Sequence, residues 1–547
     1  MPLAGGGLQF ANMNRARHLL QSSTIVILFF GLDKVIGLLR TLLIGREFGT
    51  SPAYDAFTAA NQLPEVFVTL ISGGALAAAF IPVYSARLTS QHARTAARVA
   101  NATLTLVLIV LGAISAAGAL FAPWLTRVLL VPDYPVEMQQ LTAELMRIIL
   151  LQTTLFGISG VLSSILNAHQ HFALPALAPI ALQAGYLVGL FVFVPTMGGD
   201  IHGLAWGTVV GGLLHILIQI PALTRYRFRY RPVLGIRLDG VREIVRLMGP
   251  RIITLGSIQV ADLFIIRITS GLPPGSTSGY FYAYYLQQLP ETLFGTAIGI
   301  VVFPTLAELF NAADIARLKR VAMNTLKIVW MLTVPAGAGL LLLGRPAIAL
   351  ILERGAFDAA STRLVYGVLI FFSVRVVSEA TLEIVARLFY AQHNTKTPMY
   401  ASLVWLGVTV TLLYLFVDDL GLGGLALATT VGFTVQSTLL FFLNRRALGS
   451  LGERDLLASL GRMLTATAGM SLVIILVREL IDRGILDGAV DALTQLLGGL
   501  FAPSDAASLL YLVIGSLAGA ATYTALNLLL GGRELPTLVR IIRPQPV

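Results

Sequence analysis

The sequence of 547 residues contains no cysteine, which excludes disulfide bridges, thiolate metal sites and cysteine nucleophiles together. Charged residues are also scarce, at 12% of the chain against 56% hydrophobic residues. A soluble domain carries about twice that share of charge. The composition therefore indicates a membrane protein.

Catalytic motifs are absent as well. The sequence has no phosphate-binding loop, no Gly-x-Ser-x-Gly elbow and no zinc-type set of His and Cys residues. His169 and His171 form the closest histidine pair, but we place them in a loop and expect no metal there. We therefore expect a protein that is not an enzyme, hydrolyses no ATP and needs no cofactor beyond a coupling ion. The N-terminal region also lacks the apolar segment and small-residue cleavage site of a signal peptide, so we expect no signal peptide to be cleaved off.

The net charge of +10 would favour a nucleic-acid partner if the protein were soluble. Here the basic residues gather in loops between apolar runs. Membrane topology and anionic lipid headgroups explain such a pattern, so we expect no nucleic acid.

The chain repeats itself after about 220 residues. Leu63-Pro64-Glu65 recurs as Leu289-Pro290-Glu291, and Ala168-His169-Gln170 is answered by Ala391-Gln392-His393. Further pairs are Pro82 with Pro304, Pro123 with Pro346, and Gly203-Leu204-Ala205 with Gly424-Leu425-Ala426, and all offsets fall between about 221 and 226 residues. One duplicated unit explains these pairs best. Duplicated halves around a midplane site are typical of secondary transporters.

Apolar runs of roughly 20 residues, long enough to span a membrane, occur about fourteen times. They are centred near residues 34, 72, 110, 153, 184, 213, 260, 294, 332, 374, 408, 432, 470 and 518. Basic loops alternate with loops that are poor in Lys and Arg. The positive-inside bias then places both termini in the cytoplasm of a multi-pass protein.

These patterns divide the chain into six parts. They are a cytoplasmic N-terminal segment (1–23), an N-lobe of spans 1–6 (24–223), a basic cytoplasmic linker (224–246), a C-lobe of spans 7–12 (247–446), spans 13 and 14 (447–531) and a cytoplasmic tail (532–547). A short amphipathic helix is expected over Val241–Met248, within and beyond the linker. The last two spans have no counterpart in the repeat.

Several short motifs follow one another in a fixed order from about residue 20 to residue 445. They include Gly37-Leu38-Leu39-Arg40, Asp55-Ala56-Phe57, Leu63-Pro64, Asn167 through Phe172, Gln219-Ile220-Pro221, Gln288-Leu289-Pro290, Glu353-Arg354-Gly355-Ala356-Phe357 and Lys396-Thr397-Pro398. As an ordered set they resemble the MurJ (MviN) family of lipid II flippases, within the multidrug, oligosaccharidyl-lipid and polysaccharide exporter superfamily.

The resemblance implies a flippase that moves lipid II, a lipid-linked peptidoglycan precursor, from the inner to the outer leaflet of a bacterial plasma membrane. It implies a central cavity with cationic residues for the diphosphate and sugar headgroup. A groove beside the last two spans would hold the lipid tail. The expected partners are lipid II or a related polyprenyl-diphosphate saccharide, membrane lipids and cell-wall synthesis proteins.

Three positions depart from the family pattern, because Val68, Gly73 and Tyr285 stand where the family carries charges. They leave two alternatives open: an exporter of another polyprenyl-diphosphate-linked oligosaccharide, or a flipping-incompetent paralogue that acts as a cell-wall scaffold. The two spans beyond twelve argue against the first alternative. The retained Lys34 and Arg40 argue against the second.

Ionisable residues inside spans are functional candidates, since an unpaired charge is unfavourable in lipid. Lys34 and Arg40 lie under two helical turns apart, and two cations suit a diphosphate. The alternative is that Arg40 reaches for the membrane interface. Asp55 is either a gate residue or the N-cap of the second span. The full set of substrate-binding candidates is Lys34, Arg40, Asp55, Arg251, Arg267, Tyr285 and Arg375.

The tenth predicted span carries Arg375, Glu379 and Glu383 on one helical face. In one interpretation Arg375 pairs with Glu379 and the ladder is structural. In the other, Glu383 has no helix partner and binds a coupling ion, Na+ or H+. Asp262 and Glu379 are further ion-coupling candidates.

The two Leu-Pro-Glu motifs complete the candidate set. Pro64 and Pro290 interrupt their helices, and broken helices occur where transporters form cavities. Glu65 and Glu291 would then lie at a gate, or at the membrane edge in a structural role. We therefore predict an all-α polytopic membrane protein of about 14 spans, working by alternating access and driven by the membrane potential or an ion gradient.

Overall fold

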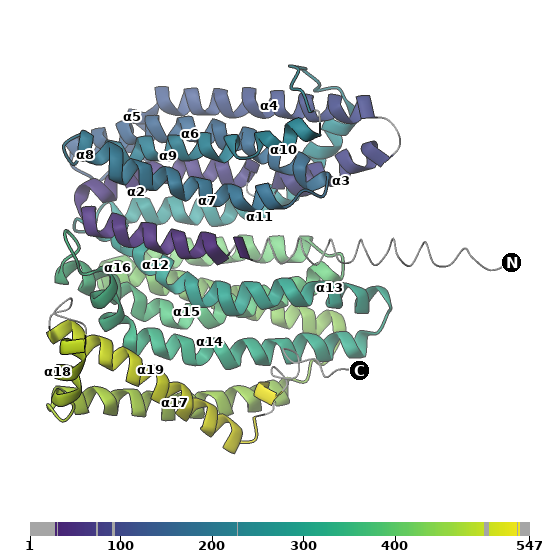
Figure 1. Cartoon of the computed structure of the whole chain (residues 1–547). Helices are drawn as coiled ribbons and strands as arrows, with labels where there is room; N and C mark the ends of the chain where they lie inside the picture. Colours follow the sequence, from purple (N-terminus) through teal and green to yellow (C-terminus); the bar gives the residue numbers. More distant parts are fainter. Residues whose placement is uncertain are drawn as a thin grey trace. The chain divides into compact units, whose positions relative to one another are not determined.

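The computed structural model of this chain describes residues 28–29, 31–72, 75–89, 93–226, 228–496, 503–532 and 534–536, and regular structure in these ranges is helical throughout. The chain forms two compact units. The first contains Met1–Ile44 and Pro52–Gly271, and the second contains Gly45–Ser51 and Leu272–Val547. Figure 1 shows the helices of both units in the colours of the sequence.

A helix described over 31–48 belongs to the first unit as far as Ile44 and to the second unit from Gly45 on. Its predicted start near Thr24 lies outside the described residues. The other elements of the first unit are α2 (Pro52–Phe67), η1 (Val68–Ser72), α3 (Ala75–Thr89), α4 (Ala93–Leu120), α5 (Ala122–Trp124), η2 (Leu125–Leu130), α6 (Val136–Ala168), α7 (Ala173–Val188), η3 (Gly189–Phe193), α8 (Val194–Thr196), α9 (His202–Leu217), α10 (Ile220–Arg225) and α11 (Asp239–Thr269), where η marks a π-helix. Helix α6 lies at the centre, in contact with α2, α3, α4 and α9.

The second unit is built around α15, which packs against α12, α14 and α16. Its elements are α12 (Ser276–Glu291), η4 (Thr292–Thr296), α13 (Ala297–Asn311), α14 (Ile315–Leu352), α15 (Ala359–Ala391), α16 (Lys396–Leu448), α17 (Glu453–Asp482), α18 (Asp487–Leu496) and α19 (Pro503–Leu529). Helices α17 and α19 pack on each other and on α14, as Figure 1 shows. They are the two helices that the repeat does not explain.

Helix lengths repeat in the way the motifs do. Helices α6 and α15 are both 33 residues long. Each ends in a left-handed turn at a residue other than glycine, Gln170 with φ 59° and His393 with φ 58°. Helices α2 and α12 are both 16 residues long, and each runs into a five-residue π-helix.

Ten helices in the described part of the chain are long and apolar enough to cross a membrane. The predicted count of about fourteen stays a prediction, and two differences have clear causes. Helix α15 carries Arg363, Arg375, Glu379, Glu383 and Arg387, so its composition is less apolar. Helix α16 is 53 residues long and joins the spans predicted near 408 and 432 across a kink at Gly421.

The linker prediction needs one correction. No separate helix covers Val241–Met248, because α11 runs without a break from Asp239 to Thr269. Its first two turns are the predicted amphipathic segment. The predicted linker of 224–246 therefore ends inside α11.

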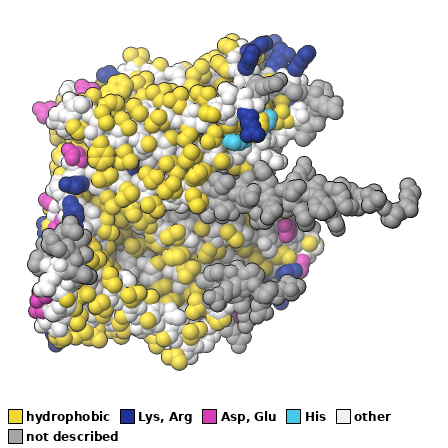
Figure 2. Space-filling view, viewed as in Figure 1, with side chains coloured by type: hydrophobic (Ala, Val, Ile, Leu, Met, Phe, Trp, Pro, Cys, Tyr) yellow, Lys and Arg dark blue, Asp and Glu magenta, His cyan; other side chains and the backbone are white. Residues whose placement is uncertain are grey.

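Glycines bring α9 unusually close to α7 and to η3, which continues α7. A Cβ atom on Gly185 would lie 2.1 Å from the Cα of Gly211, and one on Gly207 would lie 2.6 Å from the Cα of Gly189. Small residues at four-residue spacing allow such backbone contact in membrane helices. Figure 2 shows hydrophobic side chains covering much of the face in view, as expected for a surface that faces lipid.

Candidate functional site

The first cationic candidates lie on the helix over 31–48. Lys34 is exposed and Arg40 is half-buried. The guanidinium carbon of Arg40 lies 4.5 Å from the centroid of the Tyr186 ring on α7. A cation over an aromatic face gains about 0.5–2 kcal/mol. The Nε atom of Arg40 is buried and has no hydrogen-bond partner in the described residues.

A second contact fixes the same helix on α7. The Nε2 atom of Gln183 donates to Asp33 Oδ1 at 3.1 Å.

The side chain of Glu65 is exposed and accepts a hydrogen bond from Thr69 Oγ1 at 3.3 Å. Arg40 is near enough to act on Glu65 electrostatically. In the first unit, Arg40 thus lies over Tyr186 and acts on Glu65, while Asp33 of the same helix is bound to Gln183.

The remaining first-unit candidates lie elsewhere. Asp55 is 1% exposed and lies in the first turn of α2, which starts at Pro52, so it is not the N-cap. Asp262 is half-buried on α11. Arg267 donates through Nη1 to the carbonyls of Val128 at 2.6 Å and Leu129 at 3.2 Å, which ties the end of α11 to η2. The side chain of Arg251 lies outside the described part of the structure.

The predicted histidine loop forms an aromatic cluster after α6. His169 stacks on Tyr226 with ring centroids 4.5 Å apart, and its Nε2 atom lies 3.2 Å from the Tyr84 hydroxyl. Burial lowers the pKa of His169 below its usual 6.5. The pKa of His171 is also lowered, first by burial and then by the charge of Arg225.

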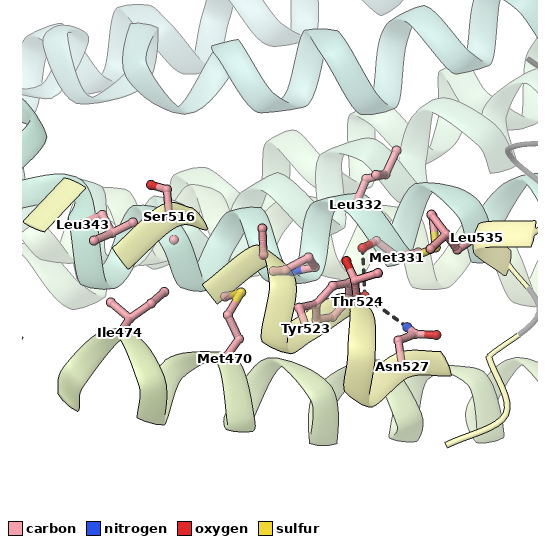
Figure 3. Close-up of a pocket in the computed structure, with 13 residues that line it drawn as sticks. Met331, Leu332, Leu343, Met470, Ile474, Ser516, Tyr523, Thr524, Asn527 and Leu535 are labelled. Carbon is pink, nitrogen blue, oxygen red and sulfur yellow. Dashed lines mark hydrogen bonds between the residues drawn. The ribbon is translucent and has the colours of Figure 1, made fainter. Parts of the chain in front are cut away.

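The second unit contains an apolar pocket of about 340 Å³ between α14, α17 and α19 (Figure 3). Its polar end is formed by Tyr523, whose hydroxyl donates to the Met331 carbonyl at 2.8 Å, and by Asn527, whose Nδ2 donates to Tyr523 at 3.4 Å. The lining residues are otherwise mostly apolar or small, among them Leu332, Pro335, Gly339, Leu343, Met470 and Ile474. The pocket lies beside the two helices that follow the repeat.

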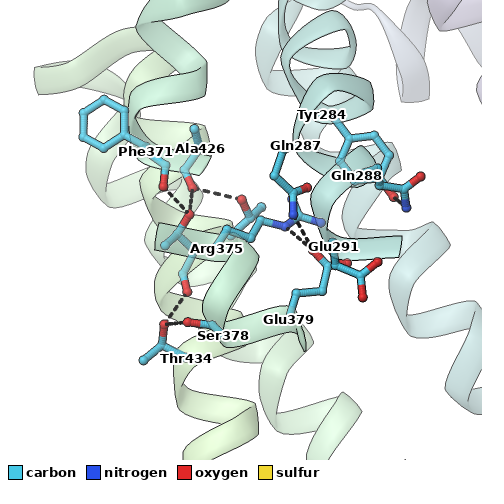
Figure 4. Close-up of polar contacts among 12 residues, drawn as sticks. Tyr284, Gln287, Gln288, Glu291, Phe371, Arg375, Ser378, Glu379, Ala426 and Thr434 are labelled. Atoms are coloured by element: carbon cyan, nitrogen blue, oxygen red, sulfur yellow. Dashed lines mark hydrogen bonds and ion pairs between the residues drawn. The ribbon is translucent and has the colours of Figure 1, made fainter. Parts of the chain in front are cut away.

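A charged cluster lies between α12 and α15 (Figure 4). Arg375 is 5% exposed, and its Nε atom donates to Glu379 Oε2 at 3.0 Å. Its guanidinium carbon also lies 4.5 Å from the Phe433 ring centroid and 5.0 Å from that of Tyr284. The predicted pair of Arg375 and Glu379 is therefore confirmed.

Residues of α12 and η4 complete this cluster. The Nε2 atom of Gln287 donates to Glu379 Oε2 at 3.1 Å. Glu291 is 4% exposed and accepts from the Thr296 hydroxyl, which lies 3.1 Å from Oε1. A Cβ atom on Gly295 would lie 2.7 Å from Glu291 Oε1 and 2.8 Å from the Cα of Ala380. Only glycine lets η4 approach the carboxylate and α15 this closely.

The interpretation of Glu383 as a carboxylate without a helix partner is wrong. Glu383 forms an ion pair with Arg387, four residues further along α15. Charges of opposite sign at this spacing lie on the same side of a helix and attract. Arg387 lies one turn beyond Glu383, so the row of charged residues that starts at Arg375 is one residue longer than predicted.

Both Leu-Pro-Glu motifs lie at helix irregularities, as the proline spacing predicted. Pro64 lies inside α2 and Pro290 inside α12, and each helix passes into a π-helix, η1 or η4, within one turn. Proline removes a backbone donor, which favours such a local change of hydrogen bonding. The two glutamates differ, since Glu65 is exposed and Glu291 is buried.

Comparison with known proteins gives the same family as the motifs. The family model for the lipid II flippase MurJ matches residues 44–488. The chain is 31% identical over 443 residues to a probable lipid II flippase MurJ of Bdellovibrio bacteriovorus, covering 80% of this chain and 84% of the relative. It is 29% identical to the lipid II flippase MurJ of Burkholderia cenocepacia, covering 78% and 83%.

The chain belongs to the MurJ lipid II flippase family. It is thus a multi-pass membrane protein of a transporter family. The fold agrees, because a solved lipid II flippase MurJ in an inward closed conformation superposes with a TM-score of 0.74 at 21% identity, covering 92% of this chain and 98% of that one. An inward-facing MATE multidrug transporter follows at a TM-score of 0.67 and 17% identity, covering 77% and 96%.

This member of the MurJ family also has contacts that sequence reasoning missed. Tyr186 and Gln183, which contact the helix over 31–48, gave no signal because their partners lie far away in the sequence, 150 residues in the case of Gln183 and Asp33. Gln287 was missed for the same reason. Arg387 did carry a signal, namely its four-residue spacing from Glu383. Tyr285, one of the predicted substrate-binding residues, is 42% exposed, and its ring lies 5.8 Å from that of Tyr284.

Proposed function

We propose that this chain moves lipid II from the inner to the outer leaflet of a bacterial plasma membrane, with both termini in the cytoplasm. The observation that carries the proposal is that Arg40 is oriented by a neighbouring ring but has no ion-pair partner in the described residues. Its guanidinium is oriented by Tyr186, and no carboxylate lies within ion-pair distance of it in the described residues. Such a cation is held in place and still has donors for a ligand.

The chemistry of Arg40 suits a diphosphate headgroup. Guanidinium groups bind phosphate oxygens through two parallel hydrogen bonds, and these bonds are stronger than those between neutral groups. Lys34, exposed on the same helix, would add a point charge less than two turns away. The negative charge of Glu65, on which Arg40 acts electrostatically, would weaken the binding of an anion and so favour its release.

The apolar pocket of the second unit would bind a portion of the polyprenyl tail. Its walls offer hydrocarbon side chains from α14, α17 and α19, and burial of apolar surface stabilises a bound lipid by about 25 cal/mol per Å². Headgroup and tail would then be recognised by different kinds of site, one cationic and one apolar.

The membrane potential supplies a driving force for such a cargo. An anionic headgroup that leaves an inside-negative cell moves with the field, which yields about 2.3 kcal/mol per charge per 100 mV. We propose an alternating-access cycle in which the headgroup crosses with the protein and the tail stays in lipid.

Complementation tests the proposal. A bacterium depleted of its own lipid II flippase would receive the wild type, Arg40→Ala, Arg40→Lys or the control Arg98→Ala, which removes an exposed arginine of α4. We expect rescue by the wild type and the control, weak rescue by Arg40→Lys because the planar fork is lost, and none by Arg40→Ala at equal membrane expression.

Two results would contradict the proposal in different ways. Full rescue by Arg40→Ala would remove Arg40 from headgroup binding. Failure of a well-expressed wild type would remove lipid II as the cargo. Another polyprenyl-diphosphate saccharide would then be the better candidate, in line with the uncharged Val68 and Tyr285.

A further inference from the structure

Three carboxylates lie near one another in the second unit, and two of them have arginine partners. Glu379 pairs with Arg375 at 3.0 Å, and Glu383 pairs with Arg387. The third, Glu291, is 4% exposed. In the described part of the chain its hydrogen-bond donor is the Thr296 hydroxyl, and no lysine or arginine forms an ion pair with it.

The surroundings of Glu291 disfavour a negative charge. The charged groups that act on it are Glu379, Glu383 and Arg375, all from α15. Two of the three are negative, and Arg375 is already engaged by Glu379. Helix α12 contributes the uncharged Gln287, and η4 contributes Thr296. A buried carboxylate without a cation is strongly unfavourable unless it takes up a proton.

A second observation also indicates a proton on Glu291. Gln287 is 0% exposed and lies one turn before Glu291 on α12. Its Nε2 atom donates to Glu379, so its Oε1 atom is an acceptor. That Oε1 atom is buried and has no donor in the described residues. Figure 4 shows Gln287 and Glu291 beside Arg375 and Glu379. A protonated carboxyl group would bring an O–H donor to this cluster.

We propose that Glu291 is a proton-binding site of the second unit, occupied by H+ in this conformation and emptied when the unit changes conformation during transport. The role in transport rests on the proposed flippase function, but proton occupancy does not. Glu291 lies directly before η4. Since π-helical turns inside helices are frequent at functional sites, we place the conformational change at η4, where it would expose the carboxyl group to water and release the proton.

Infrared spectroscopy of the purified full chain in lipid nanodiscs tests occupancy directly. A protonated carboxyl group has a carbonyl stretch that an ionised carboxylate lacks, and this band shifts in heavy water. We expect wild type and the control Glu308→Gln, an exposed carboxylate of α13, to share one band at neutral pH that Glu291→Gln loses. Glu291→Asp should keep the band at a shifted position.

An unchanged spectrum in Glu291→Gln would show that Glu291 is ionised and would overturn the proposal. A band that sodium chloride removes at constant pH would identify a sodium ion as the occupant and would overturn it as well. Glu291→Gln keeps the size and neutrality of the protonated acid, so it should fold like the wild type.

The transport role is measured by adding a lipid II hydrolase outside spheroplasts and following headgroup release. We expect release by the wild type to depend on an imposed proton gradient, and release by Glu291→Gln to be independent of it. Equal gradient dependence in both would overturn the role in transport. If the wild type moves no lipid II but the infrared band is present, the proposed cargo fails and the proton site stands.

Discussion

At the scale of single residues, buried charges in the second unit are stabilised by nearby side chains of opposite charge and by aromatic rings, not by hydration. Arg375 contacts a carboxylate and several aromatic rings. Arg375 is only 5% exposed, so protein groups surround most of its side chain. Removal of one partner from such a pair leaves the other charge buried and unpaired, which is the more damaging change.

We therefore expect Arg375→Met to destabilise the protein by about 3–5 kcal/mol. The matched control is Arg478→Met, which breaks an exposed ion pair. The side chain of Arg478 is 60% exposed and that of its partner Asp482 is 62% exposed. An exposed helical pair contributes about 0.3–0.5 kcal/mol. Unfolding midpoints in detergent measure both, and Glu379→Gln should restore part of the loss in Arg375→Met. Equal losses in the two arginine variants would contradict the burial argument.

The His169 cluster predicts a pH dependence. Because the pKa of His169 is lowered in the folded state, the unfolded state binds more protons below pH 6.5. Stability should therefore be complete above pH 6.5 and decline as the pH falls toward the lowered value. Melting temperatures on either side of pH 6.5 measure this decline, and His169→Gln should make it smaller. A decline of the same size in His169→Gln would assign it to other groups.

At the scale of elements, glycine positions decide how closely helices approach. The contact of α7 with α9 brings backbone atoms of Gly185 and Gly211 within reach of one another. The same principle operates at Gly295, where η4 approaches α15. In lipid, where the hydrophobic effect does not drive helices together, close packing of this kind supplies much of the attraction.

Gly211→Val should separate α7 from α9 and destabilise the first unit by about 1–3 kcal/mol, the usual range for overpacking. Gly112→Val is the control, since a Cβ atom on Gly112 of α4 meets no other atom within 4 Å. Thermal unfolding in detergent compares the two. If both variants lose the same stability, helix propensity explains the loss better than packing does.

The sequence predicted the helical class, the repeat and the two Leu-Pro-Glu irregularities, because apolar runs, motif spacing and proline are local signals. It also predicted the pair of Arg375 with Glu379, whose spacing is helical. It did not predict that Tyr186 lies over Arg40 or that Gln287 reaches Glu379. Those contacts join segments 146 and 92 residues apart, and no local pattern encodes which residue of one helix faces which residue of another.

At the scale of the whole molecule, the two helices after the repeat enclose an apolar pocket rather than extend a lobe. Helices α17 and α19 contact α14, and the pocket lies between the three. A Cβ atom on Gly339, which lines the pocket, meets no other atom within 4 Å. A large side chain at this position would fill the pocket without disturbing the helix packing.

Gly339→Phe should therefore fold normally and reduce lipid II translocation several-fold if the pocket holds part of the tail. The control is Gly461→Phe on α17, where a Cβ atom also meets nothing within 4 Å and which does not line the pocket. The hydrolase assay compares translocation by the two variants, and their melting temperatures show whether both are stably folded. Unchanged translocation in a stable Gly339→Phe protein would show that the tail binds elsewhere.

Residues 45–51 belong to the second unit although the chain around them belongs to the first. The Arg46 carbonyl accepts from the Ala356 backbone nitrogen at 2.8 Å, and the Thr50 hydroxyl lies 2.8 Å from that of Ser361, 311 residues later. At a synthesis rate of about 5–20 residues per second, these partners leave the ribosome roughly 15–60 s after Thr50 does. Residues 45–51 therefore cannot form these contacts with the second unit until the chain has been made as far as Ser361.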